Sequence, residues 1–307
     1  MQANVREKVK EKIPQVQSGV PLCNHTTFRI GGKARYFLET EDKEGIISAL
    51  RTAKRIGLPF YLLGGGSKVL ASDDGFDGLI IKTKNEGLEI KGNEIRVEAG
   101  FSLEKLIKIA VADELQGLEW AAGIPGTVGG AVRGNAGAWE GDMSKIVKRV
   151  EVFDIKADKK RSFGNQDCHF DYRDSIFKQY PYLVILGCEI LLEEGDKEKS
   201  EEKIKGYLDY RKQKHPLEFP SAGSIFENPK GEGKENPCNL SAGKIIGDCG
   251  LAGKRIGNVK ISEKHSNFIV NLGGGKAEEV KQLIKLAKER VKQEFDILLK
   301  EELQYLN

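Results

Sequence analysis

Apolar residues recur at helical spacing in three stretches of this 307-residue chain. The first predicted helix begins near Thr40 and stops at Gly57, and its apolar face consists of Ile46, Ile47, Leu50 and Ala53. A second begins at Ser102, and its apolar stripe consists of Leu103, Leu106, Ile107 and Ala110. The third lies near the C-terminus, and its apolar face consists of Val280, Leu283, Ile284, Ala287, Val291 and Phe295.

Between these helices, short runs rich in aromatic and β-branched residues predict strands. They occupy residues 36–38, 60–63, 79–81, 95–97 and 182–192. Strands and helices that alternate with short turns predict an α+β or mixed α/β architecture. The charged run 193–202 is expected to be a solvated turn or a domain junction.

Three zones of different composition follow an N-terminal extension over residues 1–24. The first two span about 25–90 and 91–198, and the third spans 199–307. The extension carries many charges and lacks an apolar core, so we do not expect a signal peptide. No apolar run is long enough to cross a membrane, and we expect a cytoplasmic protein.

Two glycine tracts are the most informative local feature. Gly64-Gly65-Gly66-Ser67 directly follows the predicted strand 60–63, and residues 123–139 read GIPGTVGGAVRGNAGAW. Glycine lets backbone N–H groups approach a ligand, and several such groups form an anion nest that suits a pyrophosphate. Alone, the first tract is equally compatible with an ordinary tight turn. Together, the tracts suggest one long dinucleotide clamped from both ends.

Composition and motif spacing exclude several other classes. Neither tract matches the G-x-G-x-x-G of a nicotinamide-binding Rossmann unit, and there is no P-loop sequence. The net charge of +3, with Lys and Glu interleaved, argues against nucleic-acid binding. The five cysteines are odd in number and lack C-x-x-C spacing, so we expect neither a metal site nor a disulfide framework.

Several motifs carry a family resemblance. The string LLGGGSK at 62–68, followed by the tract 123–139, resembles the two phosphate loops of the FAD-binding fold of the vanillyl-alcohol-oxidase superfamily. Further motifs, in the family's order, are similar to those of UDP-N-acetylenolpyruvoylglucosamine reductases: His25–Gly32, Tyr172–Phe177, Pro220–Pro229, Ser241–Ile246 and His265–Asn271. The spacing between Tyr172 and Ser224 resembles the shorter subtype, which lacks an inserted substrate-capping loop.

This resemblance implies an α+β fold, with an FAD-binding module over 25–198 and a substrate-binding domain over 199–307. It implies non-covalent FAD, NADPH as co-substrate, and reduction of UDP-N-acetylglucosamine enolpyruvate to UDP-N-acetylmuramate in peptidoglycan precursor synthesis. It implies no nucleic-acid or membrane partner and favours a monomer, with the oligomeric state left open. The implied cofactor-binding residues are Gly64, Gly65, Gly66, Ser67, Lys68, Gly123, Ile124, Pro125, Gly126, Thr127, Val128, Gly129, Gly130, Asn135, Ala136 and Gly137.

The resemblance also implies three catalytic residues. Arg173 would hold the substrate carboxylate with its planar fork of donors, although its spacing alone fits a surface pair with Asp171 or Asp174 better. Ser224 would donate a proton to carbon, and Glu302 would act as the catalytic carboxyl, its pKa raised by the substrate carboxylate. The implied substrate-binding residues are Tyr172 and Asn228.

Some positions depart from the family's pattern. Lys68 stands where the family usually has Asn, and Glu227 replaces a frequent Lys, which would weaken attraction for the substrate's diphosphate. Residues 299–303 read LKEEL where the family is close to LEPEV, so Glu301 competes with Glu302 for the catalytic role. Glu302 lies five residues from the end of the sequence, where we expect fraying.

Two rival functions remain open from the sequence alone. One is another FAD enzyme of the same fold that oxidises an alcohol or hydroxy acid with O₂. Many such enzymes attach flavin through a His or Cys, and neither glycine tract contains one. The other is a binding module without catalysis, against which the joint presence of Arg173, Ser224 and Glu302 argues.

Overall fold

The computed structural model of the chain describes residues 9, 11–229 and 240–307. Most of the N-terminal extension's first ten residues and Cys238 therefore lie outside the described part. The chain divides into two compact units. Unit 1 consists of residues 1–19, 36–65 and 77–209, and unit 2 consists of residues 20–35, 66–76 and 210–307.

One sheet of four strands lies largely in unit 1. Its order is β1 (Gln17–Pro21), β2 (Lys33–Thr40), β5 (Phe76–Thr83) and β3 (Phe60–Leu63), with β3 and β5 parallel. The helix α2 (Lys43–Ile56) packs its apolar face against this sheet's buried side chains. It begins at Lys43 rather than near Thr40, because the carboxylate of Asp42 accepts a hydrogen bond from Gly45 N and caps the first turn.

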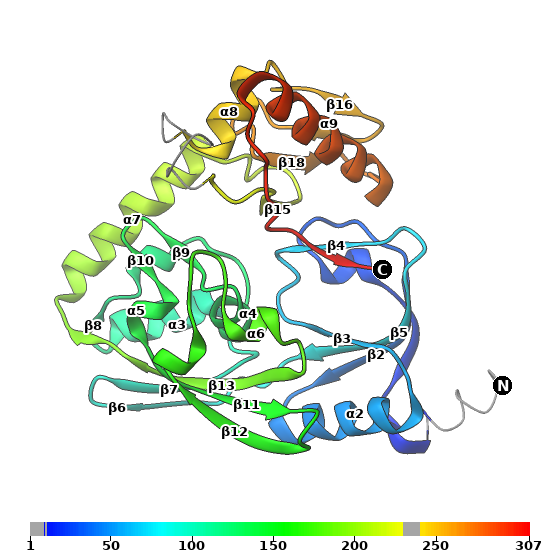
Figure 1. The fold of residues 1–307 in the computed structure, drawn as a ribbon. Helices are drawn as coiled ribbons and strands as arrows, with labels where there is room; N and C mark the ends of the chain where they lie inside the picture. Colours follow the sequence, from blue (N-terminus) through cyan, green and yellow to red (C-terminus); the bar gives the residue numbers. More distant parts are fainter. Residues whose placement is uncertain (1–8, 10, 230–239) are drawn as a thin grey trace. The chain divides into compact units, whose positions relative to one another are not determined.

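A second, antiparallel sheet forms the larger part of unit 1. Its order is β12 (Lys159–Gly164), β11 (Val147–Asp154), β13 (Leu183–Leu191), β7 (Glu94–Glu98) and β6 (Leu88–Lys91). The helices α3 (Leu103–Ala112) and α4 (Val128–Arg133) share a hydrophobic core with one face of this sheet (Figure 1). The hydroxyl of Ser102 caps α3, as its sequence predicts.

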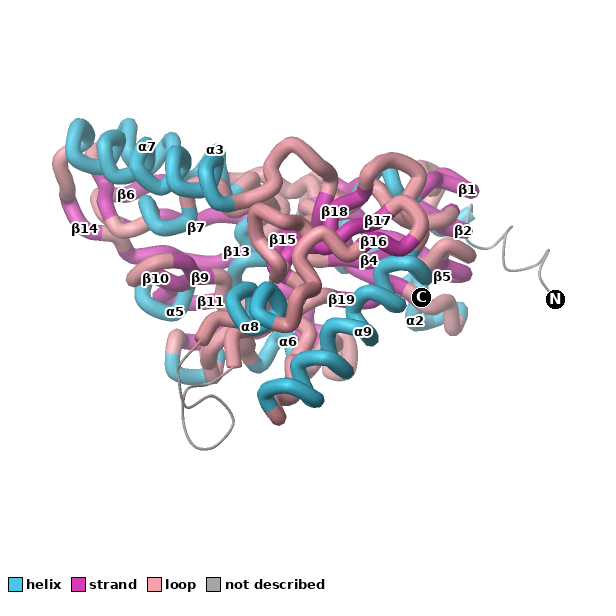
Figure 2. Tube along the Cα trace, turned by 90° about the horizontal axis from the view of Figure 1, so that it is seen from above, coloured by secondary structure: helices cyan, strands magenta, loops and turns pink. Residues whose placement is uncertain are grey.

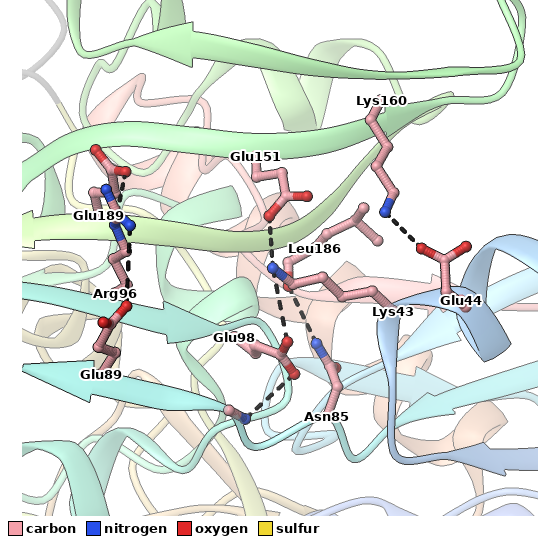
Figure 3. A network of polar contacts seen from close by, with 11 residues as sticks. Lys43, Glu44, Asn85, Glu89, Arg96, Glu98, Glu151, Lys160, Leu186 and Glu189 are labelled. Carbon is pink, nitrogen blue, oxygen red and sulfur yellow. Dashed lines mark hydrogen bonds and ion pairs between the residues drawn. The ribbon is translucent and has the colours of Figure 1, made fainter.

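Polar contacts join α2 to the second sheet within unit 1 (Figure 3). Lys43 Nζ lies 2.6 Å from Glu151 Oε2 on β11 and 3.7 Å from Glu98 Oε1 on β7. The buried amide of Asn85 donates to Leu186 O at 3.1 Å. An open groove of about 450 Å³ runs over this network, and none of the predicted site residues lines it.

The remaining elements of unit 1 are short, except for one helix. The charged run 193–202 is not a turn: it contains β14 (Glu193–Glu194) and the start of α7 (Lys197–Lys214). The helical period was missed because Ser200 is the only buried residue of α7, so the helix has no apolar stripe. The short elements are β8 (Leu115–Gln116), η2 (Glu119–Ala121), β9 (Gly137–Ala138), β10 (Gly141–Asp142), α5 (Met143–Ile146), η3 (Gln166–Cys168) and α6 (Ile176–Gln179).

Unit 2 is built on a four-stranded antiparallel sheet. Its order is β15 (Ser221–Ser224), β18 (Phe268–Asn271), β17 (Val259–Ile261) and β16 (Arg255–Ile256). Two helices, α8 (Ala242–Asp248) and α9 (Ala277–Phe295), pack with this sheet around one core (Figure 2). The apolar face predicted for α9 is buried, apart from the half-exposed Phe295.

The end of the chain does not fray. Residues Gln304–Leu306 form β19, which pairs in parallel with β4 (Val69–Ala71) in unit 2. The pairing is extended by hydrogen bonds from Gln304 N to Lys68 O and from Ser72 N to Leu306 O, both 2.8 Å. Leu306 is 1% exposed, so burial of this side chain fixes the segment that carries Glu302. The remaining element of unit 2 is the 3₁₀ helix η1 (Leu22–His25).

Candidate functional site

The two glycine tracts meet inside unit 1. A Cβ on Gly65 would lie 2.6 Å from Gly126 Cα, and one on Gly64 would lie 2.6 Å from Thr127 Oγ1. Such distances are shorter than any real contact of a Cβ, so only glycine allows the two backbones to approach this closely. At this point the tracts form one joined backbone surface. That the two tracts hold one dinucleotide between them stays a prediction.

The tract 123–139 is not a loop throughout. Val128–Arg133 form α4, whose first turn is capped by Thr127 Oγ1, which accepts a hydrogen bond from Gly130 N. Val128, Ala131 and Val132 are buried at the i, i+3, i+4 spacing of a helix. The two glycines between them hid this signal, since glycine is a poor helix former. The segment from Gly123 to Thr127 remains a loop.

Arg173 occupies a strained turn in unit 1. Asp171 and Asp174 exchange two backbone hydrogen bonds of 3.1 Å, which leaves Tyr172 and Arg173 at the tip. Arg173 has a φ of 56°, a left-handed conformation that a side chain normally avoids. The guanidinium donates to Gly137 O at 2.7 Å and lies 5.0 Å from the centre of the Tyr172 ring. The turn thus aims Arg173 at the end of the second glycine tract, as local strain at functional sites often does.

A half-buried cation on α4 is linked to this turn. Burial lowers the pKa of the Arg133 guanidinium on α4, and the nearby charge of Asp174 opposes the shift. Burial raises the pKa of Tyr61, which precedes the first glycine tract on β3. The hydroxyl of Ser175 donates to Arg133 O at 2.6 Å. The charge of Arg133 opposes the rise in the pKa of Tyr61. Arg133 therefore interacts with the strand before the first tract and, through its carbonyl oxygen, with the Arg173 turn.

Ser224 ends the edge strand β15 of unit 2. Gly223 directly before it has a φ of 70°, and the register of β15 against β18 shifts between Ser221 and Ser224. This bulge changes the direction in which the last residue of the strand points. The carbonyl oxygen of Ser224 accepts a hydrogen bond of 2.5 Å from Lys68 Nζ. Within the described part of the chain, the Ser224 hydroxyl has no hydrogen-bond partner.

Glu302 lies beside Ser224, and Glu301 faces a different set of partners. Glu302 N donates to Ile225 O at 2.9 Å, and its carboxylate lies 3.2 Å from Lys68 Nζ. The carboxylate of Glu301 pairs with Lys288 on α9 and accepts from the hydroxyl of Tyr305. Adjacent side chains of an extended segment point in opposite directions, so only one of the two glutamates faces Lys68.

Two neighbouring residues also have specific contacts in unit 2. The side-chain oxygen of Asn228 accepts a 3.0 Å hydrogen bond from Ala242 N, the first residue of α8. The Glu227 carboxylate lies 3.0 Å from Lys300 Nζ, and its side chain is only 8% exposed. Glu227 N donates to Lys300 O at 2.9 Å. Residues 225–227 and 300–302 are therefore joined by backbone bonds and by an ion pair.

The structure groups the predicted site residues into two sets. Unit 1 contains Gly64, Gly65, the tract from Gly123 to Gly137, Tyr172 and Arg173. Unit 2 contains Gly66, Ser67, Lys68, Ser224, Asn228 and Glu302. In unit 2, a Cβ on Gly66 would lie 2.2 Å from His25 O, so the first tract is also closely packed there.

Sequence reasoning missed the grouping of Lys68 with Ser224 and Glu302. Lys68 was expected beside a pyrophosphate, whereas its ammonium reaches the two predicted catalytic residues. The grouping depends on the pairing of β4 with β19, which joins segments more than two hundred residues apart. No local pattern reports such a pairing.

Two properties of the described residues bear on the class of site. Among residues 9, 11–229 and 240–307, no cluster of His, Cys, Asp and Glu is arranged to hold a metal ion. Over the same residues, no helix combines the length and apolar character that a membrane crossing requires.

Comparison with known proteins identifies both halves of the chain. Residues 34–158 match the family model of an FAD binding domain. Residues 215–306 match the C-terminal domain of UDP-N-acetylenolpyruvoylglucosamine reductase.

Whole-chain relatives extend these matches. The UDP-N-acetylenolpyruvoylglucosamine reductase of Caldicellulosiruptor bescii is 42% identical over 289 residues, which cover 93% of this chain and 89% of the relative. The enzyme of the same name from Caldanaerobacter subterraneus subsp. tengcongensis is 37% identical and covers 97% and 96%. The crystal structure of the reductase from Thermus caldophilus matches with a TM-score of 0.79 and 32% identity, over 95% of this chain and 99% of that one.

Proposed function

The chain belongs to the family of UDP-N-acetylenolpyruvoylglucosamine reductases, and we propose that Arg173, Ser224 and Glu302 perform its chemistry. The predicted α+β FAD-binding fold is confirmed. The protein is an FAD-dependent oxidoreductase that uses NADPH to reduce UDP-N-acetylglucosamine enolpyruvate in peptidoglycan precursor synthesis. The observation that best supports these roles is the placement of Glu302 beside Ser224, with Lys68 in contact with both.

The glycine tracts fit a flavin dinucleotide. Gly64, Gly65 and Gly126 carry no side chains of their own, so the backbone N–H groups at these positions can approach a phosphate. We assign the cofactor contacts to both tracts, and the absence of His and Cys from them supports non-covalent binding. When bound by these tracts, FAD would supply hydride transfer from NADPH to the enolpyruvyl group.

Arg173 would bind the carboxylate of the enolpyruvyl group. Hydride addition at the far carbon places additional negative charge on this carboxylate, so a preorganised cation there stabilises the transition state. The guanidinium forms parallel hydrogen bonds to a carboxylate and cannot lose its proton. Its position at the tip of a strained turn, with one nitrogen already held by Gly137 O, limits the orientations it can adopt.

Ser224 would donate the proton to the carbon next to the carboxylate. A serine hydroxyl is a weak acid and must be aligned by its surroundings. The bulge at Gly223 and the hydrogen bond from Lys68 Nζ to the Ser224 carbonyl fix the backbone of this residue. Its hydroxyl is then positioned by the strand rather than by a side-chain partner.

Glu302 is our choice for the catalytic carboxyl. It lies on the same side of the C-terminal segment as Lys68 and next to Ile225, whereas Glu301 is engaged by Lys288 and Tyr305. Asn228 and Tyr172 remain proposed substrate contacts.

The compartment and assembly are also proposals. NADPH and UDP-sugars are metabolites of the cytoplasm, so the substrates support a cytoplasmic enzyme. All the residues proposed here come from one chain, which is consistent with a monomer.

The decisive experiment measures the two half-reactions of Ser224→Ala separately. Bleaching of the flavin by NADPH requires no protein proton donor to carbon and is expected at close to the normal rate. Recolouring by the enolpyruvyl nucleotide sugar is expected to slow by about 10²–10⁴-fold, the usual contribution of a general acid. Ser162→Ala on the exposed strand β12 is the matched control and is expected to change neither rate. Equal slowing of both halves would make Ser224 a flavin-positioning residue, and slowing of neither would place the donor elsewhere.

A further inference from the structure

We propose that Lys68 is a positioning residue for the reduction step, whose ammonium group holds the Glu302 carboxylate and the Ser224 backbone in fixed relation. The inference rests on the proposed function, because it assumes that Ser224 and Glu302 act on the substrate. It assigns to Lys68 a task that the glycine tract before it does not predict.

The contacts of Lys68 are specific. Its Nζ atom lies 2.5 Å from Ser224 O and 3.2 Å from Glu302 Oε1. An ammonium group has three donors and no acceptor, so it can serve both oxygens at once. The side chains of Lys68 and Glu302 are 33% and 16% exposed, which limits the screening of this pair by water. Hydrogen bonds to charged partners of this kind are about twice as strong as neutral ones.

Backbone hydrogen bonds fix the segments on both sides of the Lys68 ammonium group. Gln304 N donates to Lys68 O at 2.8 Å, and the β4–β19 register begins at Val69 and Gln304. On the other side, Glu302 N donates to Ile225 O at 2.9 Å. The ammonium therefore spans three segments whose main chains are already joined, unlike a surface lysine that pairs with whichever carboxylate is near.

Loss of the ammonium would act on Glu302 and Ser224 in different ways. The Glu302 carboxylate would lose the positive partner that holds its rotamer, in a site where water reaches only part of it. The Ser224 carbonyl would lose a charge-assisted hydrogen bond, and the bulged end of β15 would become freer. Both changes misplace groups that act on the substrate, and a displacement of about 1 Å can slow a reaction by about 10²-fold.

The ion pair of the neighbouring glutamate, Glu301, provides a matched control. Lys288 on α9 forms the corresponding ion pair with Glu301, whose side chain is 18% exposed. Lys288→Met removes a cation from the neighbouring carboxylate and leaves Glu302 untouched. It therefore separates a general effect on the C-terminal segment from an effect that passes through Glu302.

The first test measures enolpyruvyl reduction by Lys68→Met, Lys68→Arg and Lys288→Met, each saturated with FAD. We expect Lys68→Met to lower kcat about 10- to 100-fold with little change in KM. Lys68→Arg should recover most of this loss because it restores the charge and the donors, and Lys288→Met should match the wild type. A normal kcat for Lys68→Met, or an equal loss in Lys288→Met, overturns the proposal.

The second test asks whether Lys68 acts through Glu302. In the Glu302→Ala background, Lys68→Met is expected to lower the residual kcat by a smaller factor than in the wild-type background, because only its contact with the Ser224 carbonyl remains to be lost. In the apoprotein, Lys68→Met should lower the urea midpoint of unfolding more in the wild-type background than in Glu302→Ala. Losses of the same size in both backgrounds, in either measurement, overturn the proposal.

Failure of the proposed function has a different signature. If Glu302→Ala and Ser224→Ala alone retain wild-type enolpyruvyl reduction, the catalytic assignment is wrong, and the inference about Lys68 falls with it. If those two variants are impaired and Lys68→Met is not, only the inference about Lys68 is wrong.

Discussion

Gly65→Ala tests the contact between the two glycine tracts most directly. The new Cβ would lie 2.6 Å from Gly126 Cα and 3.3 Å from Gly126 C, and both are backbone atoms. Ordinary contact begins at 3.4 Å, so the two backbones must separate by about 0.8 Å at this point. Overpacking of this kind costs about 1–3 kcal/mol, which we expect as the loss in the free energy of unfolding.

Gly206→Ala is the matched control for this substitution. Gly206 lies inside the exposed helix α7, and beyond the backbone of this helix no atom of the described residues lies within 4 Å of the position that its Cβ would take. Alanine in a helix interior is about 0.5–1 kcal/mol more favourable than glycine. The same chemical change is therefore expected to destabilise the protein at residue 65 and to stabilise it at residue 206.

The assay combines urea unfolding of the apoprotein, followed by circular dichroism, with titration of the apoprotein by FAD. If Gly65→Ala pushes the two glycine tracts apart, FAD binding should weaken by at least about tenfold, which corresponds to about 1.4 kcal/mol. Gly206→Ala should bind FAD as the wild type does. A wild-type midpoint and a wild-type FAD affinity for Gly65→Ala would together refute the reasoning. Lower stability with an unchanged FAD affinity would support the contact between the two tracts but would show that they do not bind the cofactor.

Four further predictions concern charged or titratable side chains. Arg173→Lys is expected to slow enolpyruvyl turnover by about 10²-fold or more, because lysine lacks the fork of donors. Arg173→Gly should be about 1 kcal/mol more stable than Arg173→Ala in urea, since only glycine adopts a φ of 56° without strain; equal stabilities would contradict the strained turn. Glu227→Lys should lower the free energy of unfolding by about 1–3 kcal/mol in the same assay, and the second change Lys300→Glu should restore most of this loss. A double variant that is no more stable than Glu227→Lys would show that the ion pair does not stabilise the protein. Burial and the charge of Arg211 lower the pKa of His215 to about 4, below the ordinary value near 6.5. Between these two pH values the unfolded chain binds the proton and the folded protein does not, so stability should fall as pH falls through this window. His215→Gln should flatten that dependence, and an unchanged profile would show that another group titrates.

The local elements of this fold were predictable because their signals are contained in short segments. The apolar stripes of α2, α3 and α9 are periodic, and Asp42 and Ser102 cap two of these helices by short-range hydrogen bonds. By contrast, α7 carries no stripe, so its residues read as a charged linker. The helix α4 was hidden because its glycines lower helix propensity, and only burial of its valines stabilises it.

The sequence predicts which residues belong to the candidate site, but it does not predict how they are arranged in space. Arg173, Ser224 and Glu302 were recognised within motifs, but the choice between Glu301 and Glu302 depends on which direction each side chain faces. That direction follows from the β4–β19 pairing and from the bonds between residues 225–227 and 300–302. Such pairings depend on the free energy of the whole core, for which a single segment carries no signal.

The charged departures from the family's pattern are connected in this chain. Glu227 stands where the family frequently has lysine, and Lys300 stands where the pattern has a glutamate; the structure joins the two as an ion pair of 3.0 Å. In this chain the two opposite charges therefore attract one another and hold the two segments together. The carboxylate of Glu227 is then directed to Lys300 and not to a free surface. Lys68 is the third departure, and its ammonium group lies beside the Glu302 carboxylate. Glu227, Lys300 and Lys68 therefore have one effect in common: they hold residues 300–302 against the strand that ends in Ser224.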